Sequence, residues 1–94
     1  MQGGGFEWDD AKARANLRKH KISFEDARLA FDDPFGIDTL DDREDYGEER
    51  INRTALLGIR LITVTFSERN GRFRIISARK ATRDEQDEYD GQEG

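Results

Sequence analysis

The side chains of this sequence that could carry out chemistry are mostly basic: sixteen lysines and arginines, one histidine, His20, and a late tyrosine, Tyr89. Cleaving RNA without a metal ion needs a group that deprotonates the 2'-hydroxyl, cations that stabilise the pentavalent phosphate, and an acid that protonates the 5'-oxygen. Histidine, lysine, arginine and tyrosine can share these tasks. Arginine suits the phosphate best, because its planar guanidinium stays charged and offers paired donors. A metal-independent ribonuclease is therefore one enzyme class that these residues could serve.

The two most prominent candidates also have purely structural interpretations. His20 stands between Lys19 and Lys21 at the end of a predicted helix, where a cation stabilises the C-terminus of the helix. Arg79 directly follows the last predicted strand and could form an ion pair with the acidic loop or the acidic tail. Other chemistries lack their residues. The chain has no cysteine, a single histidine, no P-loop and no nucleophile elbow, which argues against zinc sites, thiolate catalysis and Ser/His/Asp hydrolysis.

Charge is segregated along the chain behind a net charge of -5. Residues 32–49 carry nine acidic side chains against one base, and residues 84–94 carry six acidic side chains and no base. Between them, residues 50–83 carry nine basic side chains against Glu68 alone. An anion-binding face on residues 50–83 and simple neutralisation by the acidic segments both fit this layout. The acidic stretch lacks the spacing of a calcium-binding loop and is predicted to be a solvated loop.

The size and composition predict one small domain that spans residues 1–94. Of these residues 34% are hydrophobic and 39% are charged, and the mean hydropathy is -0.96. We expect an ordered core over residues 6–89, with mobile ends at 1–5 and 90–94. The longest apolar run, residues 61–66, is too short to cross a membrane, and the N-terminus lacks the features of a signal peptide. A cytoplasmic location is therefore expected.

Three helices are predicted from capping residues and apolar spacing. The first covers residues 10–20, because two aspartates precede an alanine-rich stretch that ends in basic residues. The second begins at Ser23 and ends before Pro34. Its apolar face consists of Phe24, Ala27, Ala30 and Phe31. A capping box in residues 82–85 predicts a short C-terminal helix that ends at about residue 89.

Strands are predicted over residues 48–57 and 60–67, joined by a turn at Gly58-Ile59. Asn70-Gly71 is the strongest short-range hairpin signal and connects the second of these strands to a third. A short edge strand followed by the acidic loop is expected in residues 35–47. The fold class is therefore α+β, with two N-terminal helices packed on a small antiparallel sheet of three to four strands and a short C-terminal helix.

The Asn70-Gly71 turn also predicts which residues face each other. The expected pairs are Arg69 with Arg72, Ser67 with Arg74, Phe66 with Ile75, Thr65 with Ile76 and Val64 with Ser77. This register places an apolar face against the helices, and this face consists of Ile62, Val64, Phe66, Phe73 and Ile75. The opposite face is polar and basic, with Ile76 and Ala78 also on it. Like charges directly across a strand pair destabilise it, so an anionic ligand would explain Arg69 opposite Arg72.

Several motifs of this chain resemble those of the BrnT toxins, and the resemblance covers residues 6–89. The motifs are Phe6-Glu7-Trp8-Asp9, Lys12-Ala13, Asn16, Lys19-His20, Ile22-Ser23-Phe24-Glu25-Asp26-Ala27, Phe31-Asp32-Asp33-Pro34, Gly47-Glu48-Glu49-Arg50, Arg74-Ile75-Ile76-Ser77-Ala78-Arg79-Lys80-Ala81 and Glu88-Tyr89. The resemblance implies a type II toxin with a RelE-like fold, a ribonuclease that arrests translation and is neutralised by a BrnA-like antitoxin. It also implies a heteromeric complex, expected as a dimer of heterodimers, that reaches operator DNA only through the antitoxin. No cofactor or metal is expected.

Matching positions assign roles to particular residues under this resemblance. The expected catalytic residues are Arg79, which would stabilise the phosphate charge, and His20 and Lys19, which would transfer protons. The expected RNA-binding residues are Lys12, Arg72, Arg74, Lys80, Arg83 and Tyr89.

A second interpretation is a non-catalytic binding module, or an inactive toxin, that acts through antitoxin complex formation and promoter autoregulation. The basic face of the sheet is then an antitoxin interface. The two interpretations differ in one consequence, because only the nuclease loses RNA cleavage when Arg79 is removed.

Overall fold

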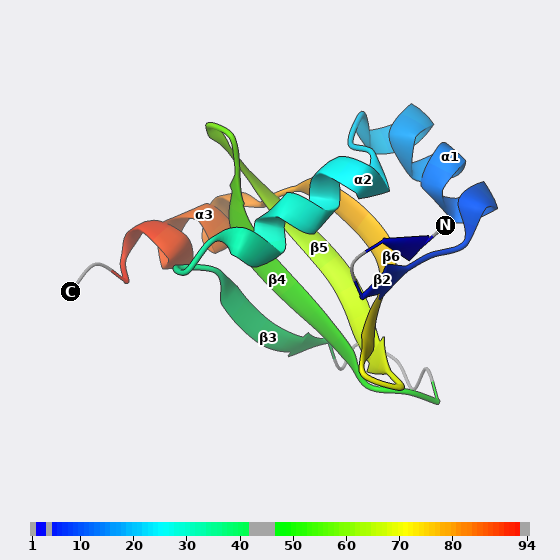
Figure 1. Ribbon diagram of the computed structural model, residues 1–94. Coiled ribbons are helices and arrows are strands. Elements are labelled where there is room, and N and C mark those ends of the chain that lie inside the picture. The colour runs from blue at the N-terminus through cyan, green and yellow to red at the C-terminus, as the bar shows by residue number, and fades with distance from the viewer. Residues whose placement is uncertain (1, 4, 42–46, 93–94) are drawn as a thin grey trace.

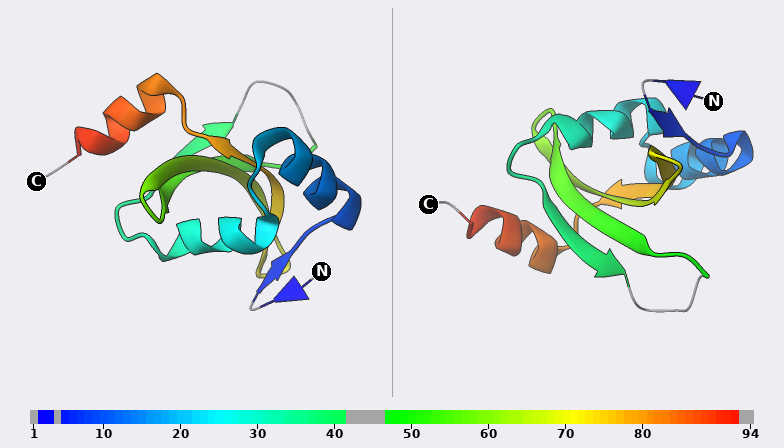
Figure 2. Two further views of the ribbon diagram at one scale, coloured as in Figure 1. Left: turned by 90° about the horizontal axis from the view of Figure 1, so that it is seen from above. Right: turned by 60° about the horizontal axis from the view of Figure 1, so that its bottom comes forward.

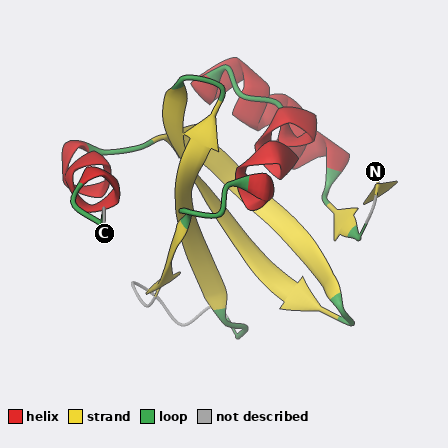
Figure 3. Cartoon of the chain, turned by 60° about the vertical axis from the view of Figure 1, so that its left-hand side comes forward, coloured by secondary structure: helices red, strands yellow, loops and turns green. Residues whose placement is uncertain are grey.

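The computed structural model describes residues 2–3, 5–41 and 47–92 of the chain. In this part of the chain a curved sheet lies between two N-terminal helical segments and one C-terminal helix (Figures 1 and 3). Residues 42–46, which belong to the predicted acidic loop, and residues 1, 4, 93 and 94, at the predicted mobile ends, lie outside the described residues. No helix within the described ranges is long and apolar enough to span a membrane.

Across the described residues the sheet has six strands and is mixed rather than antiparallel. The strands are β1 (Gln2–Gly3), β2 (Phe6–Glu7), β3 (Ile37–Asp41), β4 (Arg50–Leu57), β5 (Arg60–Arg69) and β6 (Arg72–Lys80). Their order is β1-β2-β6-β5-β4-β3, and β2 runs parallel to β6 while the other neighbours are antiparallel. The α+β class is confirmed, but the prediction of three to four antiparallel strands is wrong. Strands of two residues are too short for an alternating pattern of apolar and polar side chains, so β1 and β2 could not be predicted.

The first helix has the predicted bounds. Helix α1 (Asp10–His20) begins after Asp9, whose carboxylate accepts hydrogen bonds from the backbone N–H of Ala11 at 2.8 Å and of Lys12 at 3.3 Å. The helix ends at Lys21, which adopts the left-handed conformation with φ 62°.

The second predicted helix consists of two parts. Helix α2 (Phe24–Ala27) is a single α-helical turn capped by the Ser23 hydroxyl, and it continues as the 3-10 helix η1 (Arg28–Asp32). A 3-10 helix aligns residues three apart, which keeps Ala27 and Ala30 on the buried side. The predicted apolar face therefore packs on the sheet although the helix type changes along it.

Helices α1 and α2 cover one face of the sheet, and the core lies between these helices and the sheet (Figure 2). Its buried residues are Trp8, Ile22, Phe24, Ala27, Ala30, Ala55, Ile62, Val64, Ile75 and Ala78. Four phenylalanine rings, those of Phe6, Phe31, Phe66 and Phe73, pack beside this core with centroid distances between 4.8 and 5.8 Å. Full burial of a large apolar side chain contributes about 1.5 to 3 kcal/mol, so these contacts hold the helices in place.

The β5–β6 hairpin has the predicted turn but only part of the predicted register. Asn70 and Gly71 have φ of 54° and 76°, and the first pairs, down to Phe66 with Ile75, are as expected. The predicted pairs Thr65 with Ile76 and Val64 with Ser77 are wrong. Ile76 is an extra residue in a β-bulge, so Thr65 pairs with Ser77 and Val64 pairs with Ala78.

The bulge has a physical reason in the residues that follow it. A regular ladder would bring the Ser77 hydroxyl into the apolar core and would place Ala78 on the polar face. With the bulge, Ala78 is fully buried in the core beside Val64. The same shift moves Arg79 to the polar face, where it lies opposite Thr63.

Candidate active site

The face of the sheet away from α1 and α2 is built of small polar side chains. They are Asn52, Thr54, Thr63, Thr65, Ser67 and Ser77. Thr63 is completely buried, and its hydroxyl lies 3.0 Å from that of Thr54. The Thr65 hydroxyl donates to Asn52 Oδ1 at 2.6 Å. We call this surface the polar face. Hydrogen bonds hold the hydroxyl groups of Thr54, Thr63 and Thr65 in place beneath the charged residues.

Arg79 lies on the polar face, opposite Thr63. It forms an ion pair with Glu85, in the first turn of α3 (Arg83–Asp90). Arg79 Nη1 donates to Glu85 Oε1 at 2.8 Å, and Nη2 donates to Oε2 at 3.0 Å. Nη1 also lies 3.3 Å from the Lys80 carbonyl oxygen. The side chain of Arg79 is 32% exposed. Of the two structural partners considered for Arg79, the acidic tail is therefore the one that it contacts within the described residues.

Glu85 is fixed by several donors in addition to Arg79. The Thr82 backbone N–H donates to Glu85 Oε1 at 2.8 Å, while Thr82 Oγ1 accepts from the Glu85 N–H at 3.2 Å. This is the predicted capping box. The Thr63 hydroxyl donates to the same Oε1 at 2.9 Å. Desolvation raises the pKa of Glu85, but the hydrogen bonds from Arg79, Thr82 and Thr63 outweigh it and lower the pKa from 4.5 to about 2.

The pairing leaves one edge of the Arg79 guanidinium available. The guanidinium has five N–H groups, and the contacts with Glu85 and Lys80 use three of them. Because Glu85 is bound end-on through Nη1 and Nη2, the remaining N–H groups are that of Nε and the outer one of Nη2. Among the described residues these two have no acceptor. They form a fork that matches two oxygens of a phosphate.

Arg72 and Arg74 lie on the same face toward the other end of β6 and share one carboxylate. Arg72 Nε is 3.6 Å and Arg74 Nη1 is 3.8 Å from the carboxylate oxygens of Glu7, in β2. Ser67, directly across from Arg74, is 1% exposed, and its hydroxyl has no hydrogen-bond partner within the described part of the chain. The parallel β2 strand thus brings an acid beside two predicted RNA-binding arginines. No sequence signal placed Glu7 there.

His20 and Lys80 meet elsewhere, on the side of the sheet that α1 covers. They line a cleft of about 570 Å³ together with Lys21, Arg60 and Gln86. Lys80 pairs with Ile62, a core residue, so its side chain points to the opposite side of β6 from that of Arg79. The structure therefore brings His20 and Lys80 together but does not bring His20 to Arg79.

The other predicted basic residues do not converge on either place. Lys12 and Lys19 are exposed on α1. Arg83 is 90% exposed on α3, where its Nε lies 3.9 Å from Asp87 Oδ1. The roles expected of these three side chains stay predictions.

Tyr89 ties the far end of α3 to the rest of the molecule. Its hydroxyl donates to Asp33 Oδ2 at 2.6 Å, and the same oxygen accepts from the Leu56 N–H at 2.9 Å. Burial and the hydrogen bond to Asp33 raise the pKa of Tyr89 from 10.0 to about 12. Helix α3 is thus anchored at both ends, by Glu85 and by Tyr89.

Asn16 is the residue near the site whose role sequence reasoning missed. Its side chain is buried in α1, and Nδ2 donates to the carbonyl oxygens of Ala78 at 2.8 Å and Ile22 at 3.0 Å. Its Oδ1 accepts from the Ala78 N–H at 3.0 Å. β2 pairs with β6 only as far as Arg74, so the Asn16 amide takes the place of a neighbouring strand beside Ala78. It thereby fixes the backbone next to Arg79. The hints in the sequence were an asparagine within an alanine-rich helix and its place among the motifs that carry the family resemblance.

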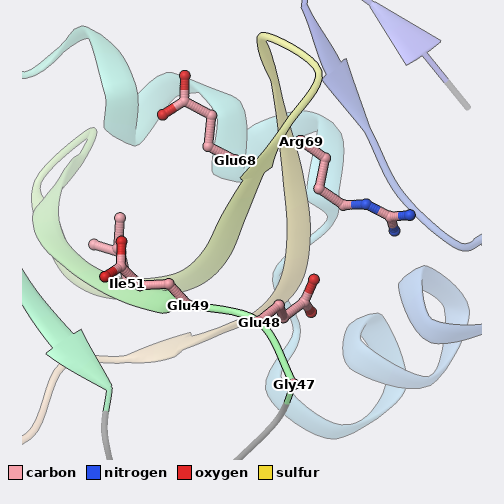
Figure 4. Close-up of a pocket in the computed structure, with 6 residues that line it drawn as sticks. All are labelled: Gly47, Glu48, Glu49, Ile51, Glu68 and Arg69. Atoms are coloured by element: carbon pink, nitrogen blue, oxygen red, sulfur yellow. The ribbon is translucent and has the colours of Figure 1, made fainter.

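A pocket of about 460 Å³ at the other end of the sheet has the wrong charge for a nucleic acid (Figure 4). Glu48, Glu49 and Glu68 line it, with Arg69 as its only base among the described residues. Within the same described ranges, no three His, Cys, Asp or Glu residues are grouped so that they could hold a metal ion. The chemistry that the described side chains offer is therefore that of fixed arginines beside hydroxyl groups.

Comparison with protein families assigns the chain to a family. A family model described as the ribonuclease toxin BrnT of type II toxin-antitoxin systems matches residues 8–85. Since the match covers most of the chain, the chain belongs to the BrnT family of ribonuclease toxins, and the resemblance noted in the sequence is confirmed. A type II system implies an antitoxin as partner. A search of curated proteins finds no match.

Proposed function

We propose that this chain is a metal-independent endoribonuclease toxin that holds the scissile phosphate of RNA against Arg79, and that a BrnA-like antitoxin neutralises it. The observation that carries the proposal is the orientation of Arg79 by Glu85, which leaves a two-donor edge of the guanidinium free. Negative charge develops on the phosphate oxygens in the transition state. A preorganised cation therefore stabilises the transition state more than it stabilises the ground state.

Arg72 and Arg74 have the role of positioning groups in this proposal. They lie on the same strand face as Arg79, so RNA that follows β6 passes all three guanidinium groups. His20 and Lys19 lie on the side of α1, so the proposal rests on stabilisation of phosphate charge and gives them no part in it. Metal independence is supported by the donor set, because the cation placed to meet the phosphate is an arginine.

The test is cleavage of a labelled RNA by the purified toxin in the presence of EDTA. Arg79→Ala should lower the cleavage rate by about a hundredfold or more, the loss typical of removing one donor to a transition-state oxyanion. Arg28→Ala, an arginine on the helical side that bonds the Glu25 carbonyl oxygen, is the matched control and should keep the rate. Full activity of Arg79→Ala would contradict the assignment, and activity that EDTA abolishes would contradict metal independence.

A cellular experiment tests the toxin role itself. Induction of the chain in bacteria should arrest growth and produce new RNA 5' ends, and co-expression of the cognate antitoxin should relieve both effects. Arg79→Ala should produce neither effect while still binding the antitoxin.

One observation favours a second function, that of a non-catalytic antitoxin-binding module. The arginines of the polar face are already paired with acids of the same chain, Arg79 with Glu85 and Arg72 and Arg74 with Glu7. Folded wild-type protein that binds the antitoxin but cleaves no RNA would establish this alternative.

A further inference from the structure

The cleft that His20 and Lys80 line has a composition unlike that of the polar face. Four of its lining residues are basic, namely His20, Lys21, Arg60 and Lys80, and none of the described lining residues is acidic. Lys21 also lines a neighbouring shallow hollow on α1, together with Arg14, Leu17 and Arg18. The two hollows form one basic surface, which we call the α1 cleft.

The α1 cleft also presents aliphatic side chains to solvent. Ile59 is 98% exposed at the tip of the β4–β5 hairpin, and Leu17 is 49% exposed on α1. The hairpin turn needs a glycine at position 58, which has φ 64°, but it has no conformational need for a β-branched residue at position 59. A fully exposed isoleucine contributes nothing to the fold. Its position beside the basic side chains of the cleft therefore points to a bound partner.

The side chains favour a protein partner over RNA at this surface. Proteins bind single-stranded RNA by stacking its bases on aromatic rings, and no aromatic residue lines either hollow among the described residues. Aliphatic anchors surrounded by cations match a segment that carries both aliphatic and acidic side chains.

We propose that the α1 cleft binds an acidic, amphipathic segment of the antitoxin, with its aliphatic side chains on Ile59 and Leu17 and its carboxylates toward Lys21, Arg60 and Lys80. The proposal rests on the proposed function only in taking the partner to be the antitoxin. Lys80 and Gln86, both in the cleft, are chain neighbours of Arg79 and Glu85. The bound segment therefore contacts the two elements, β6 and α3, whose ends hold the catalytic arginine.

The test is the affinity of the full-length toxin for its cognate antitoxin, measured by calorimetry. Ile59→Asp should weaken binding about tenfold or more, as expected for an exposed apolar anchor that becomes buried in a complex. Leu40→Asp is the matched control, because Leu40 is 58% exposed on β3 outside the cleft. Arg60→Glu should weaken binding several-fold, whereas Arg69→Glu, an exposed arginine at the other end of β5, should leave it within about twofold.

Each outcome separates this proposal from the proposed function. If the wild type binds the antitoxin and Ile59→Asp binds it equally well, the α1 cleft is not the docking surface, whatever the nuclease assay shows. If Ile59→Asp and Arg60→Glu weaken RNA binding and leave antitoxin affinity unchanged, the cleft belongs to RNA and the proposal fails. If the wild type does not bind the antitoxin, the toxin-antitoxin pairing itself is wrong. Circular dichroism spectra identical to that of the wild type show that the variants are folded.

Discussion

Arg79 and Glu85 form an end-on, two-bond ion pair, with N–O distances of 2.8 and 3.0 Å, that joins the end of β6 to the first turn of α3. The pair sets the direction of the guanidinium, because the carboxylate is itself fixed by Thr63 and Thr82. In the proposed function, Glu85 therefore has the role of a positioning residue for Arg79.

Glu85→Gln should lower RNA cleavage about tenfold, since a neutral amide cannot accept both guanidinium bonds and small errors in position are costly in catalysis. The measurement is the cleavage rate at saturating RNA, where a positioning defect lowers kcat more than it raises KM. Glu88→Gln, in the same helix but exposed, is the control. A faster Glu85→Gln enzyme would show instead that Glu85 competes with the phosphate.

The same carboxylate makes stability depend on pH in an acidic window. The pKa of Glu85 is lowered to about 2 in the folded protein from its usual 4.5, so the unfolded chain binds a proton first as the pH falls. The stability from Glu85 is complete above about pH 4.5 and is lost between pH 4.5 and 2. We expect Glu85→Gln to be less stable than the wild type at pH 7 but to lose less stability between pH 5 and pH 3. Urea unfolding at both pH values measures this, and an equal loss in both proteins would contradict the assignment.

The sequence predicts the parts of the fold that depend on local signals. Capping residues located α1 and α3, and Asn70-Gly71 located the β5–β6 turn, because each signal acts within a few residues. The bulge at Ile76 depends on which side chains the whole core accepts, and no local signal reports this. Counting pairs from the Asn70-Gly71 turn without a bulge therefore predicts the wrong partner for Thr65.

The candidate site was predictable as a set of residue types and not as an arrangement. Arg79 was identified correctly as a candidate for an ion pair with the acidic tail, but Glu85 as its particular partner follows only from the docking of α3. The expectation that His20 and Arg79 act together rests on the family resemblance, which assigns roles to positions and gives no arrangement in space. Alternation along β6 instead points Lys80 and Arg79 to opposite sides, which separates the α1 cleft from the polar face.

Asn16 should be among the side chains on which the fold most depends. Asn16→Ala leaves the buried N–H and C=O of Ala78 without partners, and each unsatisfied group costs about 1 to 3 kcal/mol. We expect a loss of about 2 to 4 kcal/mol in the free energy of unfolding, measured with urea. Asn52→Ala on the polar face, which removes one bond to the Thr65 hydroxyl, is the comparison and should cost clearly less. Equal losses would mean that the Asn16 amide does not substitute for a strand.

The hydrogen bond between Tyr89 and Asp33 should anchor the C-terminal half of α3. Tyr89→Phe removes this bond and should cost about 1 to 2 kcal/mol, because the acceptor is charged. Hydrogen exchange should become faster in α3 and remain unchanged in β5. A double-mutant cycle with Asp33→Asn isolates the pairwise energy, and a coupling near zero would show that the two residues do not stabilise each other.

The arginines paired with Glu7 lead to a prediction about RNA affinity that a simple count of charges would miss. Each phosphate contact releases counterions, so the double variant Arg72→Ala with Arg74→Ala should bind a non-cleavable 2'-O-methyl RNA with less dependence on salt. The slope of the logarithm of the binding constant against the logarithm of the salt concentration should become shallower by about 1.4. Glu7→Gln should act in the opposite direction, because it frees both guanidinium groups from a carboxylate that competes with phosphate. Filter binding between low and physiological salt measures both variants against Arg28→Ala as the control. If Glu7→Gln leaves the affinity unchanged while Arg79→Ala lowers it, RNA contacts the Arg79 end of β6 and does not extend along the strand to Arg72.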